Sequence, residues 1–173
     1  DPILAVTLQP QDAFELWQIP LFILLGVLCG LMAWYFTSMN SRVGGFFKSI
    51  DKQYKKWLWG GAILGILIFV FPPLYGEGYE GFTSLMHGNA QELFNNSLFY
   101  RFRDIDWVII LFVIATMFFK VIAMSTTNAA GGVGGTFAPS LFVGAFTGAS
   151  LALVCNTLFG WEVSIVSFTL VGM

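Results

Sequence analysis

The residues best suited to chemistry lie in one glycine-rich segment of an apolar stretch. From Asn128 to Gly144 the chain reads NAAGGVGGTFAPSLFVG, without a charged residue. Each glycine is less favourable in a helix than alanine by about 1 kcal/mol, so a regular helix is disfavoured here. Irregular backbone at membrane depth is tolerated only where it is buried in protein or lines a cavity. The segment therefore predicts a break between two helices, and its lack of charge argues against a plain surface loop.

Directly after the glycines, the sequence predicts the start of an apolar helix that can bind an anion. Pro139 suits the first turn of a helix, where the N–H groups have no intrahelical acceptor. The N–H groups of Thr136 and Phe137 then point out of the helix at the positive end of its dipole. Gly134 and Gly135 carry no Cβ, so a ligand can approach the backbone. We expect these four residues to form an anion site, although a break made only for close packing explains them equally well.

Residues for enzymatic, metal or nucleic-acid chemistry are scarce. The chain has one histidine, and Cys29 and Cys155 each lie in a long apolar stretch, where cysteine acts as a small hydrophobe. No Cys/His cluster, intramembrane acid–base pair or G-x-S-x-G motif is present. The net charge of -2 and the pI of about 5.2 do not suit a nucleic-acid binder. We therefore expect no enzyme, no metal site, no cofactor and no nucleic-acid partner.

The composition is that of a protein that crosses a membrane several times. Hydrophobic residues make up 57% of the 173 residues, charged residues make up 10%, and the mean hydropathy is +0.76. Soluble domains carry about 25% charged residues, which they need to cover their surface. The chain also holds 19 phenylalanines and 6 tryptophans. An all-α polytopic membrane protein is expected, with tightly packed tilted helices.

The few charged residues mark where the chain leaves the membrane. A spanning helix needs about 20 mostly apolar residues, and the interval between Glu15 and Arg42, for example, contains no charge. We expect a single membrane domain over residues 1–173, and, because the chain stops at Met173 inside an apolar run, a segment of a larger protein. The predicted spans are 16–39, 57–72, 105–124, 137–158 and an incomplete one over 163–173.

The two longest polar connections differ in charge, which predicts their sides. The connection 42–56 has five basic residues and Asp51, whereas the connection 77–106 has five acidic residues and two arginines. Cytoplasmic loops are enriched in Lys and Arg, so 42–56 is predicted to be cytoplasmic and 77–106 extracytoplasmic. Binding of anionic lipid or of a partner by 42–56 remains an alternative to a plain solvated loop.

Pairs of glycines at four-residue spacing place two small residues on one helix face. They occur at Gly26/Gly30, Gly61/Gly65 and Gly144/Gly148. Such pairs let a second helix approach closely. They predict a tightly packed bundle.

The segment Gly134–Ala145, GGTFAPSLFVGA, resembles the third signature, GG-x-F-x-P, of the CLC chloride channels and chloride/proton antiporters. The likeness extends to LFILLGVLCG at 21–30, to GEGYEG at 76–81 and to TLVGM at 169–173. It covers nearly the whole chain. The resemblance implies a partial CLC-type fold, taken from the second half of the membrane domain of such a protein.

The resemblance also implies a role for each matched residue. Chloride would be bound by the backbone N–H groups of Thr136 and Phe137, with Phe137 lining the pathway and Gly134 and Gly135 permitting the approach. The threonine departs from the family, which commonly has a branched aliphatic residue there. The family further implies a homodimer, and in its antiporters coupled protons. Its serine-containing and glutamate-containing signatures would lie upstream of Asp1, and its anion-coordinating tyrosine would lie downstream of Met173. The sequence therefore does not distinguish a channel from an antiporter.

Lys120 has two interpretations, and the function has an alternative. A lysine near the end of a span usually extends its ammonium group to the membrane interface. In the other interpretation, Lys120 is a charge in the outer vestibule that raises the local chloride concentration. The alternative to anion transport is a secondary carrier for another solute, with the glycine-rich break as its hinge.

Overall fold

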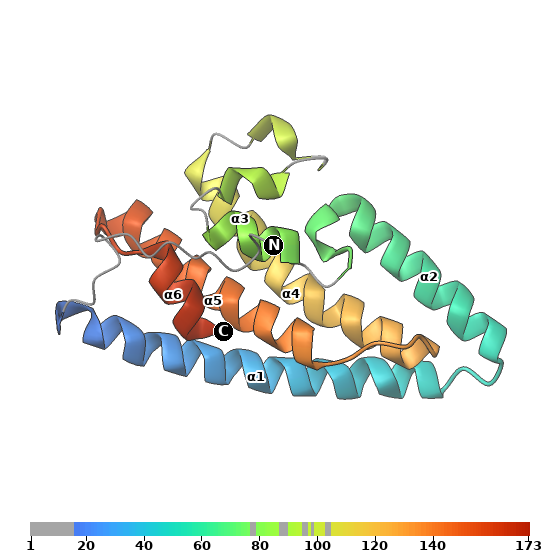
Figure 1. Ribbon diagram of the computed structural model, residues 1–173. Helices are drawn as coiled ribbons and strands as arrows, with labels where there is room; N and C mark the ends of the chain where they lie inside the picture. Colours follow the sequence, from blue (N-terminus) through green and yellow to red (C-terminus); the bar gives the residue numbers. More distant parts are fainter. Residues whose placement is uncertain (1–15, 77–78, 87–89, 95–96, 98, 103–104) are drawn as a thin grey trace, which may run out of the picture.

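The computed structural model describes residues 16–76, 79–86, 90–94, 97, 99–102 and 105–173, and in these the regular elements are all helices (Figure 1). This confirms the all-α prediction. The long helices are α1 (Ile19–Lys48), α2 (Gln53–Val70), α4 (Asp106–Ala130) and α5 (Phe137–Phe159). The shorter ones are η3 (Leu16–Gln18), η4 (Pro72–Leu74), α3 (Tyr79–Met86), η5 (Ala90–Phe94), η6 (Tyr100–Phe102) and α6 (Ile165–Gly172).

Three helical segments are long and apolar enough to cross a bilayer. They are Leu16–Lys48, Asp106–Ala130 and Phe137–Phe159, and they contain most of the predicted spans 16–39, 105–124 and 137–158. The other two predicted spans coincide with shorter or more polar helices. Two lysines lie in the first turn of α2, and α6 has 8 residues.

The predicted connection over 42–56 is mostly helical, and this corrects its expected extent. The helix α1 continues past Met39 as far as Lys48, because no proline interrupts it. It ends where the N–H of Ser49 reaches the carbonyls of Gly45 and Phe46 and the Ser49 hydroxyl donates to the Phe46 carbonyl at 2.7 Å. Only residues 49–52 separate α1 from α2.

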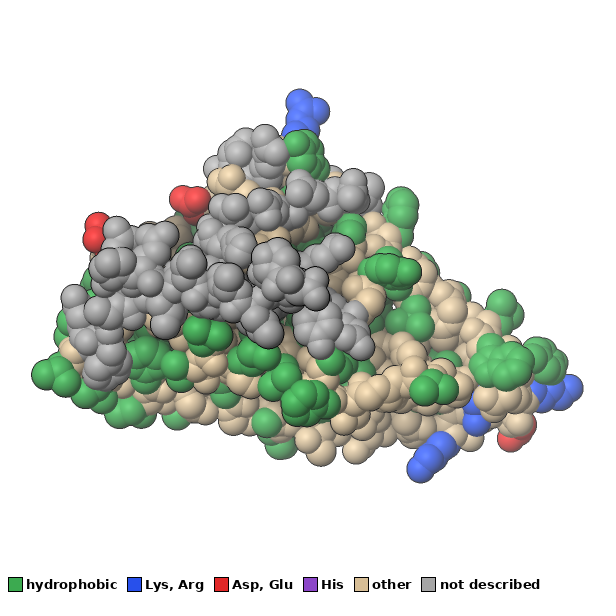
Figure 2. Space-filling view, in the orientation of Figure 1, with side chains coloured by type: hydrophobic (Ala, Val, Ile, Leu, Met, Phe, Trp, Pro, Cys, Tyr) green, Lys and Arg blue, Asp and Glu red, His purple; other side chains and the backbone are tan. Residues whose placement is uncertain are grey.

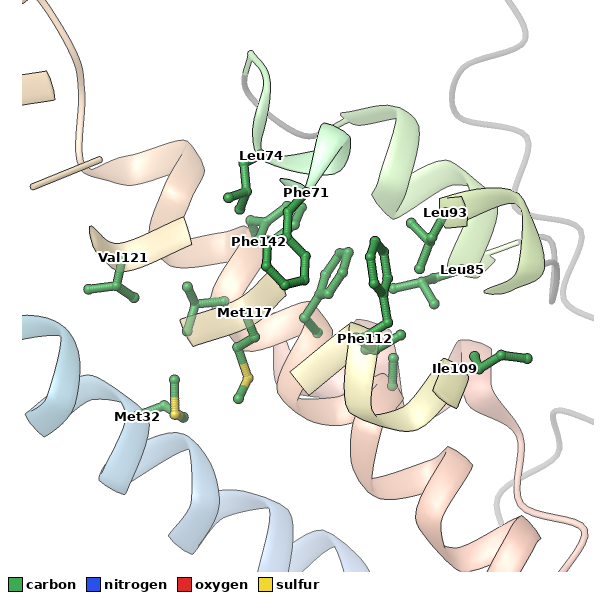
Figure 3. Close-up of a cluster of buried hydrophobic side chains, with 14 of the residues drawn as sticks. Met32, Phe71, Leu74, Leu85, Leu93, Ile109, Phe112, Met117, Val121 and Phe142 are labelled. Carbon is green, nitrogen blue, oxygen red and sulfur yellow. The ribbon is translucent and has the colours of Figure 1, made fainter. Parts of the chain in front are cut away.

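The helix α4 lies between α1, α2 and α5, and its inner face joins a large aromatic core. Figure 3 shows Phe71, Phe112 and Phe142 converging from the end of α2, from α4 and from α5. The ring of Phe112 stacks on that of Phe94 with centroids 4.4 Å apart, and Phe142 stacks on Phe146 at 3.9 Å. The aromatic core therefore joins α4 to the chain after α2, to the η5 turn and to the start of α5.

Much of the outer surface is apolar, as the composition predicts for a membrane protein. Large hydrophobic side chains stand exposed along α1, and Figure 2 shows such side chains along the lower edge of the molecule. An exposed apolar surface of this length is unfavourable in water but suits a hydrocarbon environment. The exposed residues of α1 include Ile23, Leu24, Val27, Leu31 and Trp34.

Close helix packing occurs at one of the three predicted glycine pairs. A Cβ at Gly144 would overlap the carbonyl of Gly172, and one at Gly148 would overlap the carbonyl of Phe168, so α5 and α6 touch backbone to backbone. Within the described part of the chain, a Cβ at Gly26, Gly30, Gly61 or Gly65 would meet nothing within 4 Å, so close packing at these two pairs stays a prediction. Spacing alone does not say which face of a helix meets a neighbour.

Replacing Gly148 by alanine should destabilise the protein, because its Cβ would meet backbone that cannot move aside. The expected loss is about 1–3 kcal/mol. The matched control is Gly61→Ala, where a Cβ meets nothing within 4 Å; there the better helix propensity of alanine should leave stability unchanged or raise it by up to about 1 kcal/mol. Thermal unfolding of the purified full-length protein in detergent measures both. Equal unfolding temperatures for the two variants would contradict the packing of α5 on α6.

Candidate functional site

The helix α4 ends at Ala130 because Gly131 adopts a left-handed conformation, with φ of 96°. The N–H of Gly131 donates to the carbonyl of Asn128 at 3.2 Å, and the N–H of Gly132 donates to that of Thr127 at 2.9 Å. Both bonds satisfy carbonyls that have no partner within the helix. The glycines thus close α4 in the pattern known as a Schellman motif.

A side chain from α2 holds the end of α4 in place. The amide of Gln53 donates to the carbonyl of Ala130 at 3.4 Å. A Cβ at Gly131 would lie 2.7 Å from Gln53 Nε2 and 3.4 Å from Trp57 Nε1, so glycine is needed there for space as well as for its φ angle. Sequence reasoning missed Gln53, and nothing in its spacing points to this role.

The connection between α4 and α5 runs back along the bundle. In Figure 1 it leaves the end of α4 and runs a short way back along α1 before α5 begins beside that helix. Residues 131–136 are not helical beyond the turn at Gly131, and six residues of extended chain can span roughly 20 Å. The first turn of α5 therefore lies partway along α1, whose 30 residues cover roughly 45 Å.

The start of α5 leaves several N–H groups without a partner. Phe137 is its first residue, and the carbonyl of Thr136 accepts from the N–H of Ser140 at 3.1 Å. Within the described residues no hydrogen bond uses the N–H of Thr136, Phe137 or Ala138, and the Thr136 side chain makes no cap. Pro139 has no N–H. The positive end of this helix thus presents free donors to its surroundings.

The four residues predicted to bind an anion lie together on this open segment. All of Gly134, Gly135, Thr136 and Phe137 are exposed in this chain, and the Phe137 ring is 75% exposed. A Cβ at Gly135 would meet nothing within 4 Å, whereas one at Gly134 would lie 2.8 Å from the Asn128 side-chain oxygen. Access to the free N–H groups is thus open on the side of Gly135.

The Lys120 side chain points into the protein, and its position relative to the membrane interface stays a prediction. Its side chain is buried, with 3% exposed, in the second half of α4. The ammonium group donates to the carbonyl of Leu74 at 3.2 Å and to that of Gly76 at 2.8 Å. It also lies 5.0 Å from the centre of the Phe142 ring, one turn after the start of α5. The vestibule interpretation stays a prediction, and the contacts add a structural role.

No group of three or more His, Cys, Asp or Glu side chains that could hold a metal occurs in the described part of the chain. The described residues offer backbone donors instead: free N–H groups at a helix start, next to glycines and exposed at the surface of the helix bundle. Such an arrangement can bind a small anion without a full positive charge. Together, fold and site define an α-helical membrane protein with free backbone N–H groups at a helix break.

Comparison with known proteins places the chain in a family. The family model described as voltage gated chloride channel matches residues 2–173, and the chain belongs to this family, the CLC family. The predicted family and the predicted partial CLC fold are therefore confirmed. No solved structure matches the chain significantly.

Three curated relatives are named as chloride channels. Chloride channel protein CLC-f of Arabidopsis thaliana is 31% identical over 153 residues, which cover 84% of this chain and 18% of the relative. CLC-e of the same plant is 29% identical over 136 residues, or 76% of this chain and 17% of the relative. A ClcB-like chloride channel protein of Ralstonia nicotianae is 26% identical over 159 residues, or 91% of this chain and 33% of the relative. The chain thus spans a third or less of each relative's length.

Replacing Lys120 by methionine should destabilise the protein strongly, because two carbonyls lose their donor in an apolar setting. A loss of about 3 kcal/mol is expected. The control is Lys48→Met, since that lysine is exposed at the end of α1 and its loss should change stability by about 0.5 kcal/mol at most. Thermal unfolding of the full-length protein measures both. If Lys120→Met unfolds at the wild-type temperature, the bonds to Leu74 and Gly76 are not structural.

Proposed function

We propose that the protein takes part in the transport of chloride or similar anions across a membrane. The anion is bound by the backbone N–H groups of Thr136 and Phe137, and Gly134 and Gly135 leave the approach open. The observation that carries this proposal is the start of α5, where unpaired N–H groups follow an exposed glycine-rich segment. Membership of the chloride channel family supports the choice of anion.

Backbone donors suit a site that must release its ion. A helix start carries roughly half an elementary positive charge, spread over several N–H groups. Conduction requires binding that is strong enough for entry and weak enough for exit. An arginine or lysine at the same place would hold the anion more tightly. Lys120, buried and bonded to carbonyls, would add its charge from a distance.

The proposed site needs further residues around it, because its free N–H groups are exposed in this chain. An anion stripped of its water requires donors on several sides. We propose that these come from the parts of the transporter that the resemblance implies, the serine-containing signature and the tyrosine among them. The same resemblance suggests a homodimer and, for an antiporter, coupled protons.

The hinge of a carrier for another solute remains the alternative. Such a carrier would need a break that can move. However, Gly131 packs against Gln53 and Trp57, and Gly132 lies close to Thr127. The start of the break is therefore held by neighbours on two helices. Flux assays in vesicles that compare chloride with neutral solutes separate the two functions, since a neutral solute carried without chloride would contradict the proposal.

We also propose that the turn 49–52 lies in the cytoplasm and the η6 region outside. The support is geometric as well as electrostatic. Gln53 contacts the Ala130 end of α4, whereas η6 precedes its Asp106 end, and the 25 residues of α4 separate these ends by roughly 37 Å. The two polar regions thus belong to opposite membrane faces, and the lysine-rich one is assigned to the inside.

Cysteine labelling tests this orientation. In a full-length protein whose own accessible cysteines are replaced, Ser49→Cys should react with a membrane-impermeant maleimide only after the cells are opened. Tyr100→Cys, whose parent side chain is 48% exposed, should react in intact cells. The reverse pattern would show that the orientation is opposite to the proposed one. Labelling of both cysteines from the same side would contradict the proposal that α4 spans the membrane.

A bromide ion should occupy the proposed site in crystals of the full-length protein. An anomalous peak is expected at about 3.3–3.5 Å from the N–H nitrogens of Thr136 and Phe137, because bromide replaces chloride in such sites. A complete data set without a peak at the start of α5 would refute the backbone site.

Removing one N–H group should weaken chloride binding. Phe137→Pro deletes the donor at the first helical position, where proline is tolerated. Hydrogen bonds to charged groups contribute about 1.5–3 kcal/mol, so a roughly tenfold to hundredfold rise in the chloride Kd is expected by calorimetry. Phe137→Ala is the matched control, since it loses the same ring but keeps the N–H. Equal Kd values for both variants, with thermal unfolding unchanged, would show that the amide does not bind the anion.

A further inference from the structure

The turn between α1 and α2 forms a basic surface pocket that the anion site does not use. It has a volume of about 340 Å³ and is lined by Ser49, Ile50, Asp51, Lys52, Lys55 and Trp59. Two lysines and a tryptophan therefore border the same small volume. Figure 2 shows basic side chains gathered at this end of the molecule.

The charge around the pocket is strongly positive. The stretch 42–56 contains five basic residues and one acidic residue, and four of the five basic side chains are exposed. Asp51 lies on the pocket and opposes part of this charge. The N–H groups of Gln53 and Tyr54 add to it, because Lys52 is the N-cap of α2 and its first N–H groups have no intrahelical acceptor.

Directly beyond the lysines, α2 turns apolar and aromatic. Trp57, Leu58 and Trp59 are 61%, 70% and 56% exposed, and Phe46 at the end of α1 is 56% exposed. Tryptophan is enriched where hydrocarbon meets headgroups, with its ring in the apolar part. The pocket therefore lies at the level of the headgroups, with lysines on the water side and aromatic rings on the hydrocarbon side. This order of residues matches the order of groups in a phospholipid: the lysines lie at the level of the phosphate, and the aromatic rings lie at the level of the upper acyl chain.

We propose that this pocket binds the headgroup of an anionic phospholipid. Its phosphate pairs with Lys52 and Lys55, the Ser49 hydroxyl can turn to a second oxygen, and the glycerol and upper acyl chain lie on Trp59. The exposed apolar residues beside the pocket favour a lipid over a soluble anion. An acyl chain can pack against these residues, whereas a soluble anion has no apolar part that could cover them. The proposal depends on the membrane insertion of the chain and not on anion transport.

The test compares lipid association of two charge-matched variants of the full-length protein in detergent or vesicles. Spin-labelled phosphatidylglycerol and phosphatidylcholine report, by electron paramagnetic resonance, the association constant of each lipid for the protein. The pocket variant is Lys52→Gln/Lys55→Gln. The control is Lys48→Gln/Lys56→Gln, which removes the same charge at the same end but from residues that do not line the pocket.

The wild type should prefer phosphatidylglycerol severalfold or more. The pocket variant should lose most of this preference, because the phosphate loses its direct partners Lys52 and Lys55. The control should keep most of it, because Lys48 and Lys56 act on the lipid only through diffuse surface charge. Equal losses in the two variants would show that the preference comes from diffuse surface charge, and would contradict binding in the pocket. Absence of any preference in the wild type, or its removal by excess inorganic phosphate, would overturn the lipid assignment.

Discussion

The arrangement depends on the need of backbone N–H and C=O groups inside a bilayer to find partners. In α1, α4 and α5 the helix itself satisfies them. Between α4 and α5 the helix stops, and the two sides of the break are treated differently. The carbonyls at the end of α4 are taken up by the N–H groups of Gly131 and Gly132 and by the amide of Gln53. The N–H groups at the start of α5 have no partner among the described residues, so an electropositive point arises at an exposed helix start of an otherwise apolar bundle.

The same requirement explains Lys120. An ammonium group is unfavourable in an apolar core unless it is paired, and carbonyls in an irregular turn are unfavourable unless they receive a donor. The η4 turn and Gly76, with its φ of 63°, expose such carbonyls directly above α4. Lysine and turn therefore satisfy each other and join α2 to α4. The Phe142 ring beside the ammonium group extends this connection to α5.

Long intervals with few charged residues were enough to predict the three helices that can span the membrane, because composition and length decide that property. The element boundaries were less predictable. The helix α1 runs on through Arg42 to Lys48, since 40–48 contains no proline and the adjacent Gly44 and Gly45 do not end the helix. Glycine spacing identified the contact of Gly144 and Gly148 with α6 but also pointed to two pairs that face open space in the described residues. Spacing places residues on one face, while the neighbour of that face is set by the whole bundle.

The sequence by itself determined the membrane character, the family and the position of the helix break, because each rests on local composition or on a short motif. The predicted residues Gly134 to Phe137 are contiguous, so their proximity was given in advance. Only the tertiary structure decided where the Lys120 ammonium group points, which side chain closes the end of α4, and how far α5 starts from that end. These depend on Leu74, Gly76 and Gln53, which are 44 to 77 residues away from their partners along the chain. Contacts at such separations arise from the packing of complete helices, which no local pattern records.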